Sequence, residues 1–300
     1  MDRREFVLLA AATPFTARRL LAPRAPRALV TCDTESRLAV VDLGSLRVVG
    51  QIATPPDPRA VERVGGHAVV CHTGEGVVSI VRPGGASRIV RGFAEPRYVA
   101  AHPDGRHAFV TESGRSSVAA LDLVNGEVVG RVRLTEWARH LTIDRTGTRL
   151  WVGLGSASEH VAVVRVHPFR HAATLTPGFR AHDVGCAPDG RLWVTSGDAG
   201  TLAVGSARLA ADAAPQHVTF GSGRAYVTSG DSGTFHVQAH DGRVLRRTGI
   251  PVGSYNVQYG DGLVITPSLA RGTLAVLDAH GRLRGVVDVA GSCHDACFAP

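Results

Sequence analysis

A polar residue recurs along this chain at a spacing that few folds can explain. It stands at the start of seven short extended runs, and successive members lie 38, 43, 42, 35, 39 and 38 residues apart. A repeat of about 40 residues is typical of a propeller blade of four short strands. The spacing therefore predicts a β-propeller with seven inner strands. The seven residues are Arg59, Arg97, His140, His182, His217, Asn256 and His294.

Each repeat carries the turns that four strands need. After the polar residue come an apolar run, a tight turn such as Pro188-Asp189-Gly190, and a β-rich run such as Leu192-Trp193-Val194-Thr195. Two more runs follow, for example residues 117–123 and 127–132, which Asn125-Gly126 joins. Asn-Gly between such runs favours a hairpin in which both turn residues have a positive φ.

The two ends of the repeat array complement each other. Residues 28–54 supply three strands with no inner strand before them, whereas residues 294–298 supply an inner strand with nothing after it. Pairing these segments closes the ring and leaves no open sheet edge. We therefore expect residues 28–300 to form an all-β, seven-bladed β-propeller, with its last blade closed by the N-terminal strands plus the C-terminal strand.

The strand pairs resemble the YVTN-type propeller repeat, which runs roughly Tyr-Val-Thr-Asn, a loop, then Val-x-Val-Ile-Asp. The resemblance spans residues 28–298 and implies the propeller fold. Such propellers serve as enzymes, ligand binders and surface proteins, so it implies no single activity. The matching segments are Tyr226-Val227-Thr228-Ser229, Trp193-Val194-Thr195-Ser196, Phe109-Val110-Thr111-Glu112, Leu38-Ala39-Val40-Val41-Asp42 and Leu274-Ala275-Val276-Leu277-Asp278.

The charged residues exclude several kinds of function. All 33 basic residues are arginines, so lysine Schiff bases and phosphate-loop lysines are excluded. The formal net charge is +7, but residues 1–27 account for +4 of it, and the remainder is not clustered. Nucleic-acid binding needs a clustered basic face with aromatic residues, which make up only 5% here. We expect a monomer that binds a small molecule, with no nucleic-acid partner.

The first residues resemble an export signal. The segment Asp2-Arg3-Arg4-Glu5-Phe6-Val7 resembles the twin-arginine motif, in which paired arginines precede a short apolar stretch. Here that stretch is residues 6–12, too short to span a membrane. We expect residues 1–27 to be a twin-arginine export signal and the protein to act in the extracellular, periplasmic or cell-wall space. A disordered basic tail on a cytoplasmic protein is the alternative.

Five cysteines do not form a disulfide framework in a chain of this size. Cys293 and Cys297 are expected on one strand, about 13 Å apart by strand rise and too distant to bridge each other. Cys32, Cys71 and Cys186 also fall in expected strands. We interpret the cysteines as small buried side chains. A bridge between Cys32 and Cys71 remains the alternative.

Four of the seven repeated polar residues are histidines, although Val, Ile or Thr would be preferred at the start of a strand. In a propeller these positions converge on the central channel. One interpretation is that His140, His182, His217 and His294 bind a divalent metal, with Mg, Fe, Cu and Zn left open, or that some of them act as acid and base. The other is that they line a water-filled channel.

A second resemblance concerns the channel. Segments such as Pro215-Gln216-His217-Val218 are similar to repeats of the streptogramin B lyases, seven-bladed proteins that use channel-face histidines, a magnesium ion and a glutamate. This resemblance implies the histidine role for His182, His217 and His294. Only Phe109-Val110-Thr111-Glu112 matches the segment that carries the glutamate, so Glu112 is the candidate to join His182 and His217 in catalysis.

Arg59 and Arg97 in the same ring would place permanent positive charge beside the histidines, which suits a carboxylate or another anion. With Asn256 they are the candidate ligand-binding residues; alternatively, each arginine pairs with a nearby acid. The sequence thus predicts an exported propeller that binds a small anionic molecule at a histidine-lined channel mouth, with metal-assisted lyase or oxidoreductase chemistry. A non-catalytic scaffold for protein interaction is the alternative.

Overall fold

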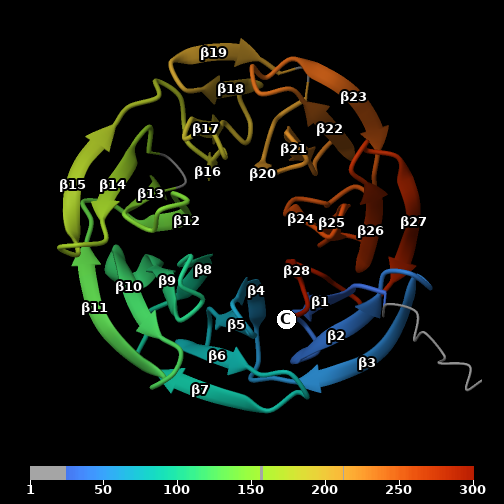
Figure 1. The fold of residues 1–300 in the computed structure, drawn as a ribbon, viewed down its shortest axis with the longest axis horizontal. Helices are drawn as coiled ribbons and strands as arrows, with labels where there is room; N and C mark the ends of the chain where they lie inside the picture. The colour runs from blue at the N-terminus through green and yellow to red at the C-terminus, as the bar shows by residue number, and fades with distance from the viewer. Residues whose placement is uncertain (1–24, 156–157, 212) are drawn as a thin grey trace, which may run out of the picture.

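The computed structural model describes residues 25–155, 158–211 and 213–300. In these ranges 28 strands form seven four-stranded antiparallel sheets, arranged as blades around a central axis (Figure 1). The predicted seven-bladed β-propeller is confirmed. The expected export signal lies almost wholly outside the described residues. A single helical turn, η1 (Ser113–Arg115), occurs in the described part of the chain.

No helix within the described ranges is long and apolar enough to cross a membrane.

The strands follow the predicted order from the axis outwards. Inner strands border the channel, and second strands lie behind them with almost every residue buried. The inner strands are β4 (Pro58–Val64), β8 (Pro96–Ala101), β12 (Ala138–Ile143), β16 (Asp183–Cys186), β20 (His217–Gly221), β24 (Gln258–Gly260) and β28 (Ala296–Phe298). The second strands are β5 (His67–His72), β9 (His107–Glu112), β13 (Arg149–Leu154), β17 (Leu192–Thr195), β21 (Arg224–Ser229), β25 (Leu263–Ser268) and β1 (Arg27–Cys32).

Third strands are also largely buried, whereas outer strands face solvent and carry most of the exposed apolar side chains. The third strands are β6 (Val77–Val81), β10 (Ser117–Asp122), β14 (Val161–Arg165), β18 (Thr201–Val204), β22 (Thr234–Gln238), β26 (Thr273–Asp278) and β2 (Arg37–Asp42). The outer strands are β7 (Ser87–Arg91), β11 (Glu127–Arg133), β15 (Arg170–Leu175), β19 (Ala207–Ala210), β23 (Val244–Gly249), β27 (Leu283–Asp288) and β3 (Arg47–Ala53).

The core lies between the faces of adjacent blades. In one interface, Val69 and Ile80 of one blade pack with Val110 and Leu121 of the next, and all four are buried. Alternating residues of each strand face opposite neighbours, so both faces of a middle strand are buried. Each such side chain stabilises the fold by about 1.5–3 kcal/mol. This packing fixes the seven inner strands in a ring.

The last blade is closed as predicted. Strand β28 pairs antiparallel with β1, with Ala28 opposite Phe298 and Val30 opposite Ala296. Beyond these pairs the main-chain N–H of Thr31 donates to the main-chain oxygen of Asp295 at 2.9 Å. The N- and C-terminal segments therefore share one sheet.

The predicted turn at Asn125-Gly126 is wrong in detail. Gly126 has a φ of 67°, but Asn125 does not have a positive φ. The Asp122 carboxylate accepts the N–H of Val124 at 2.9 Å and the side-chain amide of Asn125 at 3.0 Å, and a bulge follows Ala120 in the ladder. The carboxylate thus organises a longer loop than the two-residue turn expected for Asn-Gly.

The cysteines are thiols, and four of them are buried as expected. Cys293 precedes β28 instead of lying on it, so its expected strand placement is wrong. Cys71 packs in the interface between the β4–β7 and β8–β11 blades, whereas Cys32 packs in a different interface with Cys293. The Cys32–Cys71 alternative therefore does not hold.

Candidate functional site

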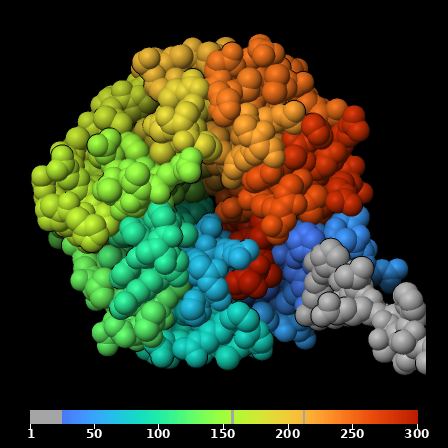
Figure 2. Space-filling model, viewed as in Figure 1, coloured from blue at the N-terminus to red at the C-terminus, as the bar shows by residue number. Residues whose placement is uncertain are grey.

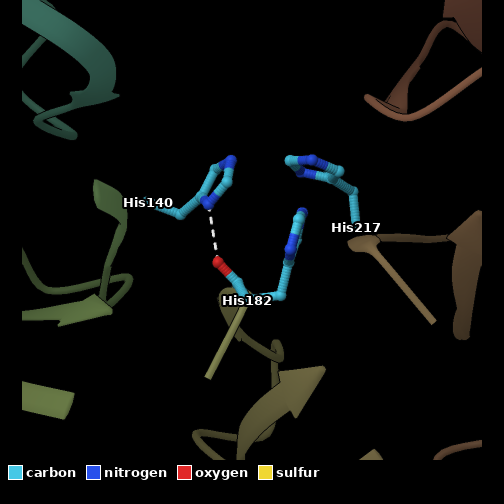
Figure 3. Close-up of side chains that lie close together, drawn as sticks. All are labelled: His140, His182 and His217. Atoms are coloured by element: carbon cyan, nitrogen blue, oxygen red, sulfur yellow. Dashed lines mark hydrogen bonds between the residues drawn. The ribbon is translucent and has the colours of Figure 1, made fainter. Parts of the chain in front are cut away.

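Three of the four predicted histidines meet beside the axis. Each of His140, His182 and His217 offers a ring nitrogen, and these atoms all lie within 4.8 Å of one another. The ring centroids are 4.4 Å apart for His140 and His217, 5.3 Å for His140 and His182, and 5.2 Å for His182 and His217. Figure 3 shows the three rings around one shared space. They come from three consecutive blades, at β12, just before β16, and at β20.

His140 is oriented by the next blade. Its Nδ1 atom lies 2.6 Å from the main-chain oxygen of His182, the dashed line in Figure 3. A carbonyl oxygen can only accept, so Nδ1 carries the proton and Nε2 keeps its lone pair. That Nε2 is buried and has no hydrogen-bond partner among the described residues. An unpartnered buried acceptor of this kind is available to a ligand.

His217 and His182 are held in place by different contacts. The Nδ1 atom of His217 lies 3.4 Å from Oδ2 of Asp183, and that carboxylate also accepts the N–H of Val218 at 3.1 Å. The His182 ring lies against Gly197, which has a φ of 77°. A Cβ atom at position 197 would come 2.5 Å from Nδ1 of His182, so only glycine leaves room for the ring.

The environment keeps the imidazoles of His140 and His182 uncharged. Burial, together with the neighbouring His217 and Arg139, lowers the pKa of His182 to about 2. Burial likewise holds the pKa of His140 well below its ordinary value, with His217 and Arg139 acting in the same direction. Both rings are therefore neutral at pH 7.

His294, the fourth predicted metal ligand, lies outside the group of three. It makes a hydrogen bond to the main chain of Arg59, and burial lowers its pKa to about 3. Its Nδ1 atom is buried without a partner among the described residues. The predicted set of four ligands is thus divided by the structure into a group of three and one separate histidine.

Bonds between neighbouring blades give three of the seven polar ring residues a structural role. His140 bonds the main chain of His182, Asn256 donates its side-chain amide to the main-chain oxygen of His294 at 2.8 Å, and His294 bonds the main chain of Arg59. In each case a side chain satisfies a main-chain group at the ring position of the following blade. Asn256, predicted to bind ligand, has this role.

The two predicted ligand-binding arginines stand at the ring with a third. The Nε atom of Arg97 donates to Oγ of Ser113 at 3.0 Å, and its guanidinium lies 4.5 Å from the centre of the Trp137 ring. Burial lowers the pKa of Arg97, and repulsion by Arg59 and Arg139 adds to this effect. The buried Nε of Arg139 has no partner within the described ranges.

Arg59 has a weak partner, because its Nη1 atom is 3.8 Å from Oδ1 of Asp57 and both side chains are about one-third exposed. The acid pairing considered for Arg59 is thus present but loose. Three arginines thus lie near the ring histidines: Arg139 acts on His140 and His182, whereas Arg59 and Arg97 act on His294. Such a concentration favours an anion, since fixed cations in a partly buried site attract negative charge.

Glu112 lies in a network of its own. Its side chain is fully buried and accepts hydrogen bonds from Arg115 at 2.6 Å, Arg131 at 2.9 Å and Ser117 at 2.8 Å. It also accepts the N–H of Ala94. These contacts join β9 to its neighbours and do not include His182 or His217. The structure therefore does not bring the three predicted catalytic residues together.

A cavity of about 400 Å³ lies along the axis, at the hollow visible between the blades in Figure 2. His140, His217 and Tyr98 line it together with the acidic residues Asp183 and Asp295. The ring of Tyr98 is 3.8 Å from that of His140, centre to centre, and burial raises the Tyr98 pKa to about 12. The cavity is large enough for a small molecule beside the histidines.

Sequence reasoning missed Tyr98, Arg139, Asp183 and Asp295. The signal for the two acids was a repeated His-Asp pair, at 182–183 and 294–295. Asp295 accepts the N–H of Val61 at 3.0 Å, as Asp183 accepts that of Val218, so each acid anchors the next inner strand. Burial raises the pKa of Asp295 well above its ordinary value.

A second group that could hold an ion lies at the β8–β9 turn and consists of His102, Asp104 and His107. Its polar atoms already bond to protein. Nε2 of His102 lies 3.2 Å from the Gly147 oxygen, and Nδ1 of His107 lies 2.6 Å from the Asp104 carboxylate. The three axial histidines are therefore the stronger candidate.

No model of a protein family matches this sequence, and no curated protein matches it. Solved structures share its fold. A functionally unknown protein from Desulfotomaculum acetoxidans DSM 771 has a TM-score of 0.79 at 12% identity, covering 91% of this chain and 99% of that one. Hydrazine synthase from Kuenenia stuttgartiensis has a TM-score of 0.73 at 16% identity, covering 83% and 91%.

Virginiamycin B lyase from Staphylococcus aureus has a TM-score of 0.67 at 11% identity, covering 77% of this chain and 84% of that one. The partial resemblance to lyases in the sequence is therefore confirmed for the fold. At such identities the comparisons show a shared fold and no shared activity.

Proposed function

We propose that this protein binds a divalent transition-metal ion through His140, His182 and His217, and a small anionic molecule beside it. The observation that carries the proposal is the meeting of three imidazole nitrogens within 4.8 Å, one of them a buried Nε2 with no partner in the described part of the chain. Three histidines with an open further position are typical of catalytic zinc sites.

The ligand type narrows the choice of metal. Imidazole nitrogen suits Zn, Cu, Fe and Ni, whereas Mg prefers oxygen ligands and octahedral geometry. Of the metals left open by the sequence, the three-histidine set thus favours Zn, Cu or Fe over Mg. A metal ion at this point would act as a Lewis acid or a redox centre, the chemistry that a lyase or an oxidoreductase needs.

The protein's own residues would supply orientation and charge. The His182 main-chain oxygen fixes the proton of His140 on Nδ1, and the Asp183 carboxylate lies beside Nδ1 of His217. Such outer contacts orient metal-binding imidazoles. Arg97 and Arg139 would attract a carboxylate or similar anion to the ring beside the histidines. Neither arginine lines the axial cavity, whose lining includes the acidic Glu62, Asp183 and Asp295.

Export is the second part of the proposal. The motif at Arg3 and Arg4 supports it, and the closed propeller is a fold that can be translocated as a folded unit. Replacing both arginines by lysine in the native host should keep the protein in the cytoplasm. Undiminished export of the double variant would refute this part without affecting the metal site.

Metal content tests the principal claim. Purified, untagged protein should hold about one equivalent of zinc, copper or iron, measured by elemental analysis after dialysis. The double variant His182→Ala with His217→Ala should hold none. His171→Ala on the outer strand β15 is the matched control and should bind as the wild type does. Full occupancy in the double variant would refute the site, and a double variant that lost only stability would assign the histidines a structural role.

Anion binding is tested on the metal-loaded protein. Oxalate serves as the probe, and isothermal titration should show that Arg97→Gln weakens its binding about tenfold, the effect of losing one charge-assisted contact. The exposed Arg133 on β11 provides the control variant Arg133→Gln, which should leave oxalate affinity unchanged. Equal affinity in all three proteins would refute the anion site while leaving the metal site intact.

A further inference from the structure

Two buried thiols meet where the N- and C-terminal segments close the ring. Cys32 is the last residue of β1, and Cys293 lies three positions before β28. Both side chains are fully buried in the same apolar cluster. The two thiol groups are hydrogen-bonded to each other.

The main chain holds the two cysteines in place from both sides. The antiparallel register pairs Val30 with Ala296, and the next contact joins Thr31 to Asp295, whose N–H donates to Oγ1 of Thr31 at 2.9 Å. Continuing this register would place Cys32 opposite His294, so Cys293 lies one residue from the position that faces Cys32. The two cysteines therefore lie at neighbouring positions of the closing contact, in one apolar cluster.

The other cysteines have no such partner within the described residues. Cys71 packs in the interface of the β4–β7 and β8–β11 blades, and Cys297 faces a different cluster from Cys293. Cys186 is partly exposed on β16. One pairing is thus selected by the fold.

We propose that Cys32 and Cys293 form a disulfide bond that locks the ring closed under oxidising conditions. The two thiols together lose two protons and two electrons as the sulfur–sulfur bond forms. The oxidant is a disulfide, for example oxidised glutathione, whose own sulfur–sulfur bond is reduced to two thiols. The reaction is an exchange in which one thiolate attacks the oxidant and the second thiol resolves the mixed disulfide.

The acid–base properties of the pair agree with this order of events. The hydrogen bond from Cys293 lowers the pKa of Cys32, although burial acts in the opposite direction. The same bond raises the pKa of Cys293. Cys32 is therefore the thiol that ionises first, and Cys293 is the thiol that resolves.

The closing contact is where a covalent bond has the greatest effect. Strand β28 makes three residue pairs with β1, whereas β1 makes six with β2, so opening of the ring begins most easily between β28 and β1. A disulfide there encloses nearly the whole propeller, and long enclosed loops give the largest restriction of the unfolded chain. Such bonds persist in oxidising compartments outside the cytoplasm, and we propose that this protein is exported to such a compartment.

The test uses the full chain and does not depend on export or on the metal site. The protein is incubated with oxidised glutathione and then denatured in the presence of an alkylating reagent that blocks free thiols. The peptides are mapped by mass spectrometry. We expect one linked peptide pair containing Cys32 and Cys293, lighter by two hydrogen atoms, and three alkylated cysteines. Five alkylated cysteines would overturn the proposal. This measurement is made on the wild-type protein and needs no variant.

Thermal unfolding tests the lock. The melting temperature of the oxidised protein should fall by about 5 °C or more on addition of a reductant. Cys32→Ala and Cys293→Ala should each abolish this dependence on reductant, whereas the control Cys71→Ala should retain it. A linked protein that melts at the same temperature with and without reductant would overturn the locking role.

Discussion

Nδ1 of His140 donates its proton to the main-chain oxygen of His182 across 2.6 Å, from one blade to the next. This bond has two consequences. It satisfies a carbonyl group near the axis, and it aims the bare Nε2 of His140 toward His182 and His217 (Figure 3). The same histidine thus joins two neighbouring blades and belongs to the candidate metal site. The two roles can be separated by mutation.

His140→Ala should abolish metal binding and also reduce the free energy of unfolding by about 1–3 kcal/mol, because the His182 carbonyl is left without its donor. His294→Ala is the matched control, since His294 makes the equivalent bond to the main chain of Arg59 but lies outside the group of three. It should have a similar effect on stability and keep the metal. Isothermal titration with Zn²⁺ and chemical denaturation measure the two effects. Loss of metal in both variants would contradict the assignment of ligands.

Gly197→Ala tests the placement of the His182 ring. The added Cβ would lie 2.5 Å from Nδ1 of His182, so the ring must move. We expect metal affinity to fall by about 10–100-fold, as when a supporting contact of a ligand is lost. Gly190→Ala is the control because Gly190 also has a positive φ, 84°, but a Cβ there meets nothing within 4 Å. Both variants carry the same backbone strain, so equal metal affinities would show that the ring does not bind.

Glu112→Gln separates a structural from a catalytic carboxylate. The buried carboxylate neutralises Arg115 and Arg131, so its loss should lower the free energy of unfolding by about 2–3 kcal/mol. Metal and oxalate affinity of the folded protein should stay unchanged, because none of its contacts reaches the histidines. Glu127→Gln, on the exposed start of β11, should change neither quantity. A variant of normal stability with lost ligand binding would restore the catalytic role.

The sequence predicted some residues of this site and missed others. The difference depends on whether a residue recurs in the repeat or acts through contacts made only in the folded chain. The spacing of the ring residues predicts the blades, because equivalent residues of successive repeats occupy equivalent backbone positions in successive blades. It also correctly places His140, His182 and His217 near the axis. It could not show that His294 turns to the main chain of Arg59, since equivalent positions in a ring share a backbone place and not a side-chain rotamer.

Glu112 shows the limit of motif matching. The segment Phe109-Val110-Thr111-Glu112 has the pattern that carries a lyase glutamate, but the partners of that carboxylate depend on how the following turn and strands fold back onto it. Arg131, on another strand of the blade, and Arg115, in η1, bind it. The sequence offered no sign of this network. Tyr98 was missed for a similar reason, because its contact with His140 exists only after two blades pack together.

Truncation tests the closure of the ring. Removal of residues 296–300 deletes β28 and leaves the edge of β1 unpaired, so we expect a large loss of stability and self-association through that edge. Size-exclusion chromatography and thermal unfolding measure both effects. Removal of Pro300 alone is the control and should change neither. A shortened chain that stays monomeric with an unchanged melting temperature would contradict closure by β28.

Glu62 gives the fold a pH dependence of its own. The carboxyl group lies by the axial cavity, where Gln258 donates to it at 2.9 Å, and burial raises its pKa to about 7. Because the folded state holds this proton up to a higher pH than the unfolded state, the contribution of Glu62 is fully present below about pH 4.5. It is lost as the pH rises to about 7 and constant above that value.

The resulting loss in the free energy of unfolding has an upper bound of about 3 kcal/mol. The actual loss is smaller, because the Glu62 side chain is only half-buried and solvent screens its charge. Glu62→Gln keeps the shape of the protonated acid and its bond with Gln258, so this part of the pH dependence should disappear, and the variant should exceed the wild type in stability at pH 8. Urea unfolding at several pH values between 5 and 8 measures the difference. Glu75→Gln, exposed in the β5–β6 loop, is the control and should follow the wild-type curve. Parallel curves for Glu62→Gln and the wild type would show that Glu62 is already ionised at pH 5.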